Sequence, residues 1–335
     1  MSNSTLEIES RNKNKYHCGP DQRIKGSTKL APPIFFRLID INSSSFQNCV
    51  SILKHLQNMI SFKSLILFVN LEVMTVPFFK EILTEPALKD FECLSLDRGK
   101  IDAECLDLVM GMAHSNRDLH IHNTKVPENY HHKNAFKFYY VYYKDARWVR
   151  IEDVFTSKNS YAAHLGWNKF TNSDMKNYIK YWIESDHDMV ETLAFFSRQP
   201  IQPESLFDGI VALKNPRHRA PSYLVATNRT KRRKYQLMGV LSYADKIYFY
   251  CKDMSLQSDG NVDNDSWEPE YKALMILNEK KELEAELKEI QKLLETSQDQ
   301  NMVKRKNEIE RELQNVSQEL AGYNLVFRDG VYSYE

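Results

Sequence analysis

The side chains best suited to chemistry in this sequence are five histidines in its first half. His120 and His122 are one residue apart in a β-rich run, so both would point to the same side of a strand, as a zinc site could require. The others lie in flanking segments: His114, His131 and His132. The group spans two turns and no matching pattern of cysteines or carboxylates accompanies it. We therefore expect surface histidines, with no metal and no cofactor.

An acidic stretch offers a second candidate ion site. The stretch fills positions 1, 3, 5 and 12 of a calcium-loop template with Asp259, Asn261, Asp263 and Glu270. The glycine that the template needs at the sixth position is replaced by Asn264, and a proline at 269 precedes the following helix. The expectation is a solvated acidic loop over residues 257–269.

One basic run could contact phosphate or act as a nuclear address: Arg229, Lys231, Arg232, Arg233 and Lys234. Neither interleaved aromatic residues nor a longer basic stripe extends it, so nucleic acid is not expected as a partner. A solvated hairpin loop is the default interpretation of the run.

Three tryptophans could anchor a protein partner, because aromatic residues dominate the energetics of interfaces. Their helical or strand spacing favours a place in the core instead, most strongly for Trp182 and less so for Trp148 and Trp167. The five cysteines are scattered without a CxxC pair, which is typical of buried thiols in a reducing compartment. The sequence contains no GxSxG, HExxH, glycine-rich phosphate loop or kinase signature, so no catalytic residue and no enzymatic activity are predicted.

Composition limits the classes of partner. The 335 residues include 45 basic and 45 acidic side chains, and a net charge of zero gives no long-range field toward nucleic acid or an anionic membrane. No apolar run approaches the roughly 20 residues of a membrane span, and the N-terminus lacks the apolar core of a secretory signal. A cytoplasmic or nuclear protein without a membrane partner is expected.

The elements that must position these residues alternate between strand-like and helical patterns from Pro33 onward. The Leu-x-Leu-type cores at Leu65/Leu67, Leu94/Leu96 and Leu119/Ile121 recur after about 25 to 29 residues, within the period of leucine-rich repeats. No asparagine ladder follows these cores at a fixed offset. The predicted fold class is α/β: an irregular leucine-rich-repeat-like β-α solenoid with a small C-terminal antiparallel sheet and a long helical hairpin or coiled coil.

The segment 171–184 shows the helical pattern most clearly. Its apolar residues fall at i, i+3, i+4, i+7 and i+8: Met175, Tyr178, Ile179, Trp182 and Ile183. Thr171 with Asp174 three positions later predicts an N-terminal cap. A neighbouring strand-plus-helix unit should bury this stripe.

The last third of the chain changes pattern. Short β-rich runs at 223–227, 235–241 and 246–252 predict a closing sheet. Beyond them, Leu283, Leu287, Ile290 and Leu294 keep a 4-3-4 spacing, as do Ile309, Leu313, Val316 and Leu320. The two seams are out of register by one residue across the polar stretch ETSQDQN. This favours an antiparallel hairpin over one dimerising helix, which remains the alternative.

These patterns divide the chain as follows: a disordered N-terminus at 1–31, the repeat-like and associated region at 32–215, a closing β segment at 216–256, an acidic loop at 257–269, a helical hairpin or coiled coil at 270–321, and a terminal strand at 322–335.

Several of these residues also carry a family resemblance. In order, WVRIEDVF, FTNSDMKNYIKYWI, MVETLAFF, LFDGI and the terminal YNLVFRDGVYS resemble the leucine-rich-like region and F-box-associated domain (type 2) of the nematode-expanded F-box protein family. An F-box itself is not recognisable in these 335 residues. The resemblance implies a non-enzymatic substrate receptor of a ubiquitin ligase, whose target protein it does not identify. A contact with a Skp1–cullin ligase would require an F-box upstream. The alternative is a coiled-coil scaffold that self-associates through 270–321.

Overall fold

The computed structural model shows a mixed α/β protein with an open sheet. The structure describes residues 34–38, 43–59, 64–196, 203–215, 217, 221–227, 233–243, 245–253, 266–296 and 299–335. The predicted disorder of residues 1–31 and most of the predicted acidic loop lie outside the described residues. The chain forms two compact units, one ending at Asn168 and the other beginning at Lys169.

The first unit alternates strands and helices along the chain, as the sequence pattern predicts. Its elements are β1 (Ile34–Leu38), α1 (Ser43–Met59), β2 (Leu65–Asn70), η2 (Leu71–Val73), α2 (Val76–Thr84), η3 (Pro86–Leu88), β3 (Cys93–Asp97), α3 (Ala103–Gly111), β4 (Asp118–Ile121), β5 (Tyr140–Asp145), α4 (Ile151–Phe155) and β6 (Ala162–Trp167). Neighbouring strands pair in parallel and in chain order from β1 to β6. Successive strands are joined by crossover segments, as parallel pairing requires.

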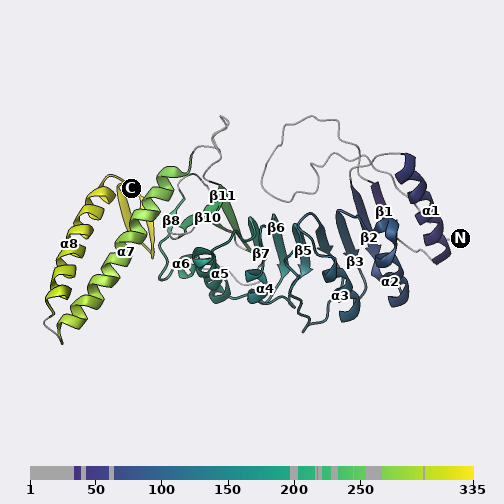
Figure 1. Cartoon of the computed structure of the whole chain (residues 1–335), viewed down its shortest axis with the longest axis horizontal. Helices are drawn as coiled ribbons and strands as arrows, with labels where there is room; N and C mark the ends of the chain where they lie inside the picture. The colour runs from purple at the N-terminus through teal and green to yellow at the C-terminus, as the bar shows by residue number, and fades with distance from the viewer. Residues whose placement is uncertain are drawn as a thin grey trace. The chain divides into compact units, whose positions relative to one another are not determined.

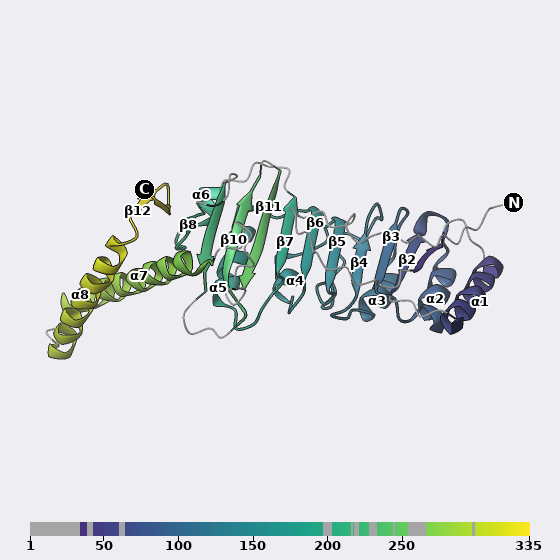
Figure 2. The same ribbon diagram turned by 90° about the horizontal axis from the view of Figure 1, so that it is seen from above.

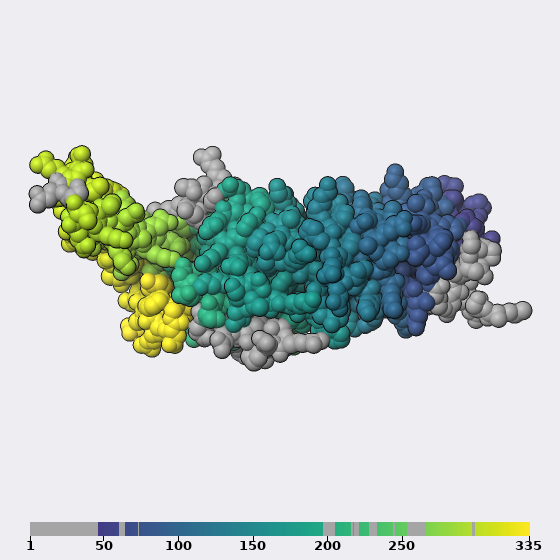
Figure 3. All heavy atoms as spheres, turned by 90° about the horizontal axis from the view of Figure 1, so that it is seen from below, coloured from purple at the N-terminus to yellow at the C-terminus, as the bar shows by residue number. Residues whose placement is uncertain are grey.

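One face of this sheet is the core face. Leu67, Leu94, Leu119 and Val141 are cross-strand partners, and each is at most 2% exposed. Helices α2 and α3 lie on the same side of the strands in both ribbon views (Figures 1 and 2). They supply buried residues such as Ile82 and Val109. In the space-filling view, the side chains of this unit form a continuous surface without a deep opening (Figure 3).

The second unit builds a mostly antiparallel sheet with helices. Its elements are α5 (Asn172–Glu184), β7 (Thr192–Phe196), α6 (Pro203–Leu206), β8 (Leu213–Lys214), β9 (Ser222–Ala226), β10 (Tyr235–Ser242), β11 (Lys246–Asp253), α7 (Glu268–Leu294), α8 (Gln300–Ala321), β12 (Leu325–Arg328) and β13 (Val331–Tyr334). The strand order is β7-β11-β10-β9-β8-β13-β12. The boundary predicted between residues 215 and 216 lies inside this sheet, because β7 pairs with β11 from the other side of that boundary.

Helix α5 begins where its cap predicts. Asp174 N–H donates to Thr171 Oγ1 at 3.3 Å, and the Thr171 amide donates to the Asp174 carboxylate at 2.8 Å. Met175, Tyr178 and Trp182 are buried. The Tyr178 ring packs edge-on against rings of β7 and β11. The predicted stripe therefore covers the sheet of its own unit.

Helices α7 and α8 pack against each other within the chain. The predicted turn in ETSQDQN lies where α7 ends and α8 begins. Ile309 is 0% exposed and lies in one apolar cluster with Leu283 and Val316. Arg305 adds a two-pronged ion pair to Glu286 of the facing helix, at 2.8 and 3.0 Å. Both predicted seams thus meet inside one chain.

The predicted terminal strand is two strands joined by a tight turn. β12 and β13 pair antiparallel, and Asp329 and Gly330 at the turn have φ of 54° and 82°. Such left-handed conformations suit glycine and are tolerated by aspartate. β13 then pairs in parallel with β8 through Tyr332 and Leu213, so the end of the chain joins the second unit's sheet. Sequence spacing missed the second strand because each strand has only four residues.

Candidate binding face of the first unit

The sheet face opposite the core face carries polar and aromatic side chains in register. Phe68, Ser95, His120, Tyr142 and His164 are successive cross-strand partners on β2 to β6. They alternate with core residues along each strand, so they share the other side of the sheet. We call this side the open face. In both ribbon views α2 and α3 lie against the opposite side (Figures 1 and 2).

Five aromatic rings form one cluster on the open face. The His120 ring lies 5.1 Å from Tyr140 and 5.8 Å from His122, between ring centroids. Tyr142 lies 5.2 Å from His122, and the Tyr140 hydroxyl is within 3.2 Å of His164 Nδ1. Edge-on ring pairs at these distances each contribute about 0.5 to 1.5 kcal/mol beyond their buried area. The cluster is therefore a preformed patch.

Burial favours the neutral form of two histidines in the cluster, His120 and His122. Desolvation, with smaller contributions from His122 and His164, lowers the pKa of His120 to about 4. The pKa of His122 is also lowered, chiefly by burial. Neutral imidazoles and tyrosine hydroxyls can each donate and accept hydrogen bonds. The patch thus combines apolar ring surface with neutral polar atoms.

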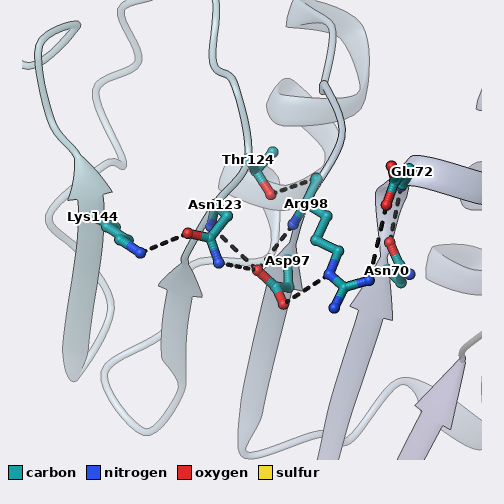
Figure 4. A network of polar contacts seen from close by, with 7 residues as sticks. All are labelled: Asn70, Glu72, Asp97, Arg98, Asn123, Thr124 and Lys144. Carbon is teal, nitrogen blue, oxygen red and sulfur yellow. Dashed lines mark hydrogen bonds and ion pairs between the residues drawn. The ribbon is translucent and has the colours of Figure 1, made fainter.

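A polar network borders the open face at the carboxyl ends of β2 to β5 (Figure 4). Asn123 Nδ2 donates to Asp97 Oδ1 at 2.8 Å, and Lys144 Nζ donates to Asn123 Oδ1 at 2.6 Å. Thr124 Oγ1 donates to the Arg98 carbonyl at 3.0 Å. The network links three adjacent strands by side chains, in place of the asparagine ladder that the sequence lacks.

Asp97 is the central acceptor of this network. Partial burial alone would raise its pKa, but hydrogen bonds from Asn123 and from the Arg98 amide lower it below the usual value. Arg98 reaches toward Glu72 at 3.9 Å, so the charged groups are arranged in opposite pairs. A ligand on the open face would meet this mixed-charge border.

A left-handed turn fixes the start of this border. Arg98 and Gly99 have φ of 61° and 64°. A Cβ on Gly99 would come within 2.6 Å of the Leu71 backbone, so only glycine fits there. The turn holds the Arg98 carbonyl where Thr124 can donate to it.

The structure separates the histidines that the sequence groups together. His120 and His122 lie on the open face, as their spacing predicts. His131 Nδ1 is 2.6 Å from the buried carboxylate of Asp153, which accepts from the Arg150 amide at the start of α4. His114 and His132 make local contacts with Asn116 and with the Asn134 amide. The alternation of side chains along the strand that contains Tyr140 and Tyr142 could have predicted that these two rings lie beside His120.

The tryptophans divide between core and surface. Trp148 and Trp182 are 4% and 1% exposed, as predicted. The weaker prediction of a core position for Trp167 is wrong, because this ring is 51% exposed at the last position of β6.

The basic run is described only at its end. Arg229, Lys231 and Arg232 lie outside the described residues. Arg233 is 8% exposed rather than solvated, and its guanidinium carbon lies 4.0 Å from the centroid of the Trp182 ring. Stacking of arginine on tryptophan is favourable, and Arg233 Nη1 also donates to the Ser185 and His187 carbonyls at 3.5 and 3.4 Å. The sequence pattern does not predict this contact because Arg233 and Trp182 are far apart along the chain.

The calcium template is likewise only partly described. Asp259, Asn261 and Asp263 lie outside the described residues. Glu270 is 5% exposed and accepts from Arg217 Nε and Nη2, each at 2.8 Å. Its carboxylate is therefore occupied by an ion pair.

The described cysteines are unpaired, as expected. Cys93, Cys105 and Cys251 are buried and Cys49 is partly buried. Cys18 lies outside the described residues. Burial raises the pKa of the Cys105 thiol to about 12, so it stays protonated.

No protein-family model matches the chain, and comparisons with curated proteins and with solved structures gave no significant match. Among the described residues, every helix is too short or too polar to cross a bilayer. Function is therefore inferred from the geometry of the open face.

Proposed function

We propose that the chain is a non-enzymatic protein-binding module whose target docks on the open face. The observation that carries this proposal is the cluster of five rings on a sheet face opposite the helices: His120, His122, Tyr140, Tyr142 and His164. Tyrosine is enriched at the centres of protein interfaces, where a rigid ring supplies contact area at low entropic cost.

The shape of the surface favours a macromolecule over a small substrate. The rings belong to three adjacent parallel strands, and the polar network extends the surface to β2 and β3. A broad face with a polar border suits a protein partner, whereas small ligands use concave pockets. Among the described residues, the hollow lined by Leu277, Leu320 and Tyr332 lies in the second unit and has Lys280 as its one charged side chain.

We further propose that the first unit is an irregular leucine-rich-repeat-like solenoid. Its parallel strands, in chain order and with a period of about 25 to 29 residues between β2, β3 and β4, support this architecture. In such proteins the strand face is a binding surface. On this basis the chain would be the target-recognition part of an F-box-type ubiquitin-ligase receptor, acting in the cytoplasm or nucleus. An upstream F-box would supply the contact with a Skp1–cullin ligase.

Self-association through 270–321 is the alternative function. Leu293 and Val303, at 44% and 45% exposed, leave some apolar surface near the tip of the hairpin. However, Ile309 and Val316 of the predicted seam are already buried against α7. A coiled-coil partner would have to use the outer surface of the hairpin, so this alternative has less support.

Affinity purification of the full chain, compared with one variant on the face and one control, tests the proposal. Tyr142→Ala removes a ring from the cluster. Tyr139→Ala, the control, removes a ring that is 43% exposed and stacks on Tyr161 outside the cluster. We expect proteins captured by the wild type and the control to be lost with Tyr142→Ala. Capture unaffected by Tyr142→Ala would contradict the proposal, and a dimeric mass by light scattering without captured proteins would favour self-association.

A further inference from the structure

Three potential metal ligands meet at one end of the open face. Cys93 on β3 and Asp118 on β4 are cross-strand partners, and His120 lies two residues after Asp118 on the same face. One ligand atom from each residue lies within 4.8 Å of the other two. We call Cys93, Asp118 and His120 the triad; it shares His120 with the ring cluster of the open face.

We propose that the triad is a binding site for a divalent cation of the zinc type. Thiolate, imidazole and carboxylate are the three ligand types that zinc takes from proteins. Zinc bonds of about 2.0 to 2.3 Å place tetrahedral ligand atoms roughly 3.4 to 3.8 Å apart. The ligand atoms, now within 4.8 Å of one another, would therefore have to approach by up to about 1.4 Å on binding, which side-chain rotation can supply.

The chemistry of the ligand set suits a dication. Cys93 is buried, with 8% of its surface exposed, and a bound metal deprotonates a coordinating thiol. The proton released from Cys93 leaves to solvent.

Two buried polar atoms beside the triad also support a bound cation. His120 Nε2 and Ser95 Oγ are both buried and find no hydrogen-bond partner among the described residues. Ser95 is the cross-strand partner of His120 and lies two residues after Cys93. Unsatisfied buried polar atoms cost about 1 to 3 kcal/mol each, so adjacent ones suggest that an absent group normally completes them. A cation would use the imidazole nitrogen.

Three protein ligands leave one tetrahedral position for water or for an atom of a docked partner. The site joins β3 to β4 at the end of the open face that is opposite the polar network. It does not depend on the proposed protein-binding function, because the ligand set stands on its own geometry.

Cobalt substitution of the purified full chain tests the site. A thiolate ligand gives cobalt(II) an intense ligand-to-metal charge-transfer band, which imidazole and carboxylate ligands lack. We expect the wild-type chain, after treatment with a chelator, to bind one equivalent of cobalt with this band, and zinc to displace it. Cys93→Ser should abolish the band, while Asp118→Asn and His120→Ala should weaken binding at least about 100-fold, beyond the 10–100-fold typical of outer-shell changes.

Two control variants distinguish the loss of a metal ligand from a folding defect. Cys105→Ser replaces another buried cysteine of the first unit, 2% exposed against 8% for Cys93, and should keep the band. His122→Ala removes the neighbouring histidine and should also keep it. Absence of the band in the wild type, its persistence in Cys93→Ser, or equal loss in Cys105→Ser would overturn the proposal. If Cys93→Ser fails to fold, the loss of cobalt affinity in Asp118→Asn still tests the site.

Discussion

The two faces of the first unit's sheet should respond very differently to truncation. Leu94 on the core face is 0% exposed and lies between Leu67 and Leu119, which are 1% and 0% exposed. Leu94→Ala removes three carbon groups at about 0.8 kcal/mol each and leaves a cavity that its strand neighbours cannot fill. The expected loss of unfolding free energy is about 3 to 5 kcal/mol.

Tyr142→Ala, in the strand next to β4, removes a larger side chain from the open face. Its ring contacts with His120 and His122 are worth about 0.5 to 1.5 kcal/mol each at most, and its surroundings are partly solvated. We expect a loss of about 1 to 2 kcal/mol, clearly below that of Leu94→Ala.

Urea unfolding followed by hydrogen exchange of peptides from the first unit measures both losses, because it separates this unit from the second. Equal losses of unfolding free energy in Tyr142→Ala and Leu94→Ala would contradict this expectation. That result would mean that the open face is covered as tightly as the core. A loss below about 1 kcal/mol for Leu94→Ala would equally contradict the assigned core.

Three further predictions concern single contacts. Thr171→Ala should destabilise the second unit by about 1 kcal/mol in urea unfolding, since the cap of α5 is lost, while Thr171→Ser should retain most of it. Ile309→Ala should lower the unfolding free energy of the α7–α8 hairpin by about 2 to 5 kcal/mol. Val303 is 45% exposed, so Val303→Ala should lower it by less than about 0.5 kcal/mol. Hydrogen exchange of hairpin peptides measures both losses. Asp97 has a lowered pKa in the folded state, so its stabilisation is present above about pH 4 and is lost as pH falls through that lowered pKa. Asp97→Asn should remove the contribution of Asp97 to the pH dependence of the urea unfolding midpoint. An unchanged pH dependence would contradict this prediction.

Local patterns predicted the elements well. The cap of α5, its buried stripe and the order of strands and helices in the first unit depend on residues close in the sequence, such as Thr171 and Asp174. The break between α7 and α8 could be predicted because a one-residue shift between two seams cannot be carried by one straight helix.

Contacts between distant residues could not be predicted in the same way. The stacking of Arg233 on Trp182, the pairing of β13 with β8, and the meeting of Cys93 with Asp118 all join segments whose register only the folded sheet fixes. Along the chain no cysteine lies close to His120. Cys93 comes near it only in the folded sheet, from the adjacent strand, 27 residues earlier in the sequence.

Site-specific photo-crosslinking tests the proposed binding role of the open face most directly. A photoreactive phenylalanine analogue would replace Tyr142 in the cluster and, in a second chain, Tyr139 outside it. We expect the probe at position 142 to crosslink the protein that the wild-type chain captures, and the probe at position 139 not to do so. Crosslinks to that protein from position 139 alone would contradict it.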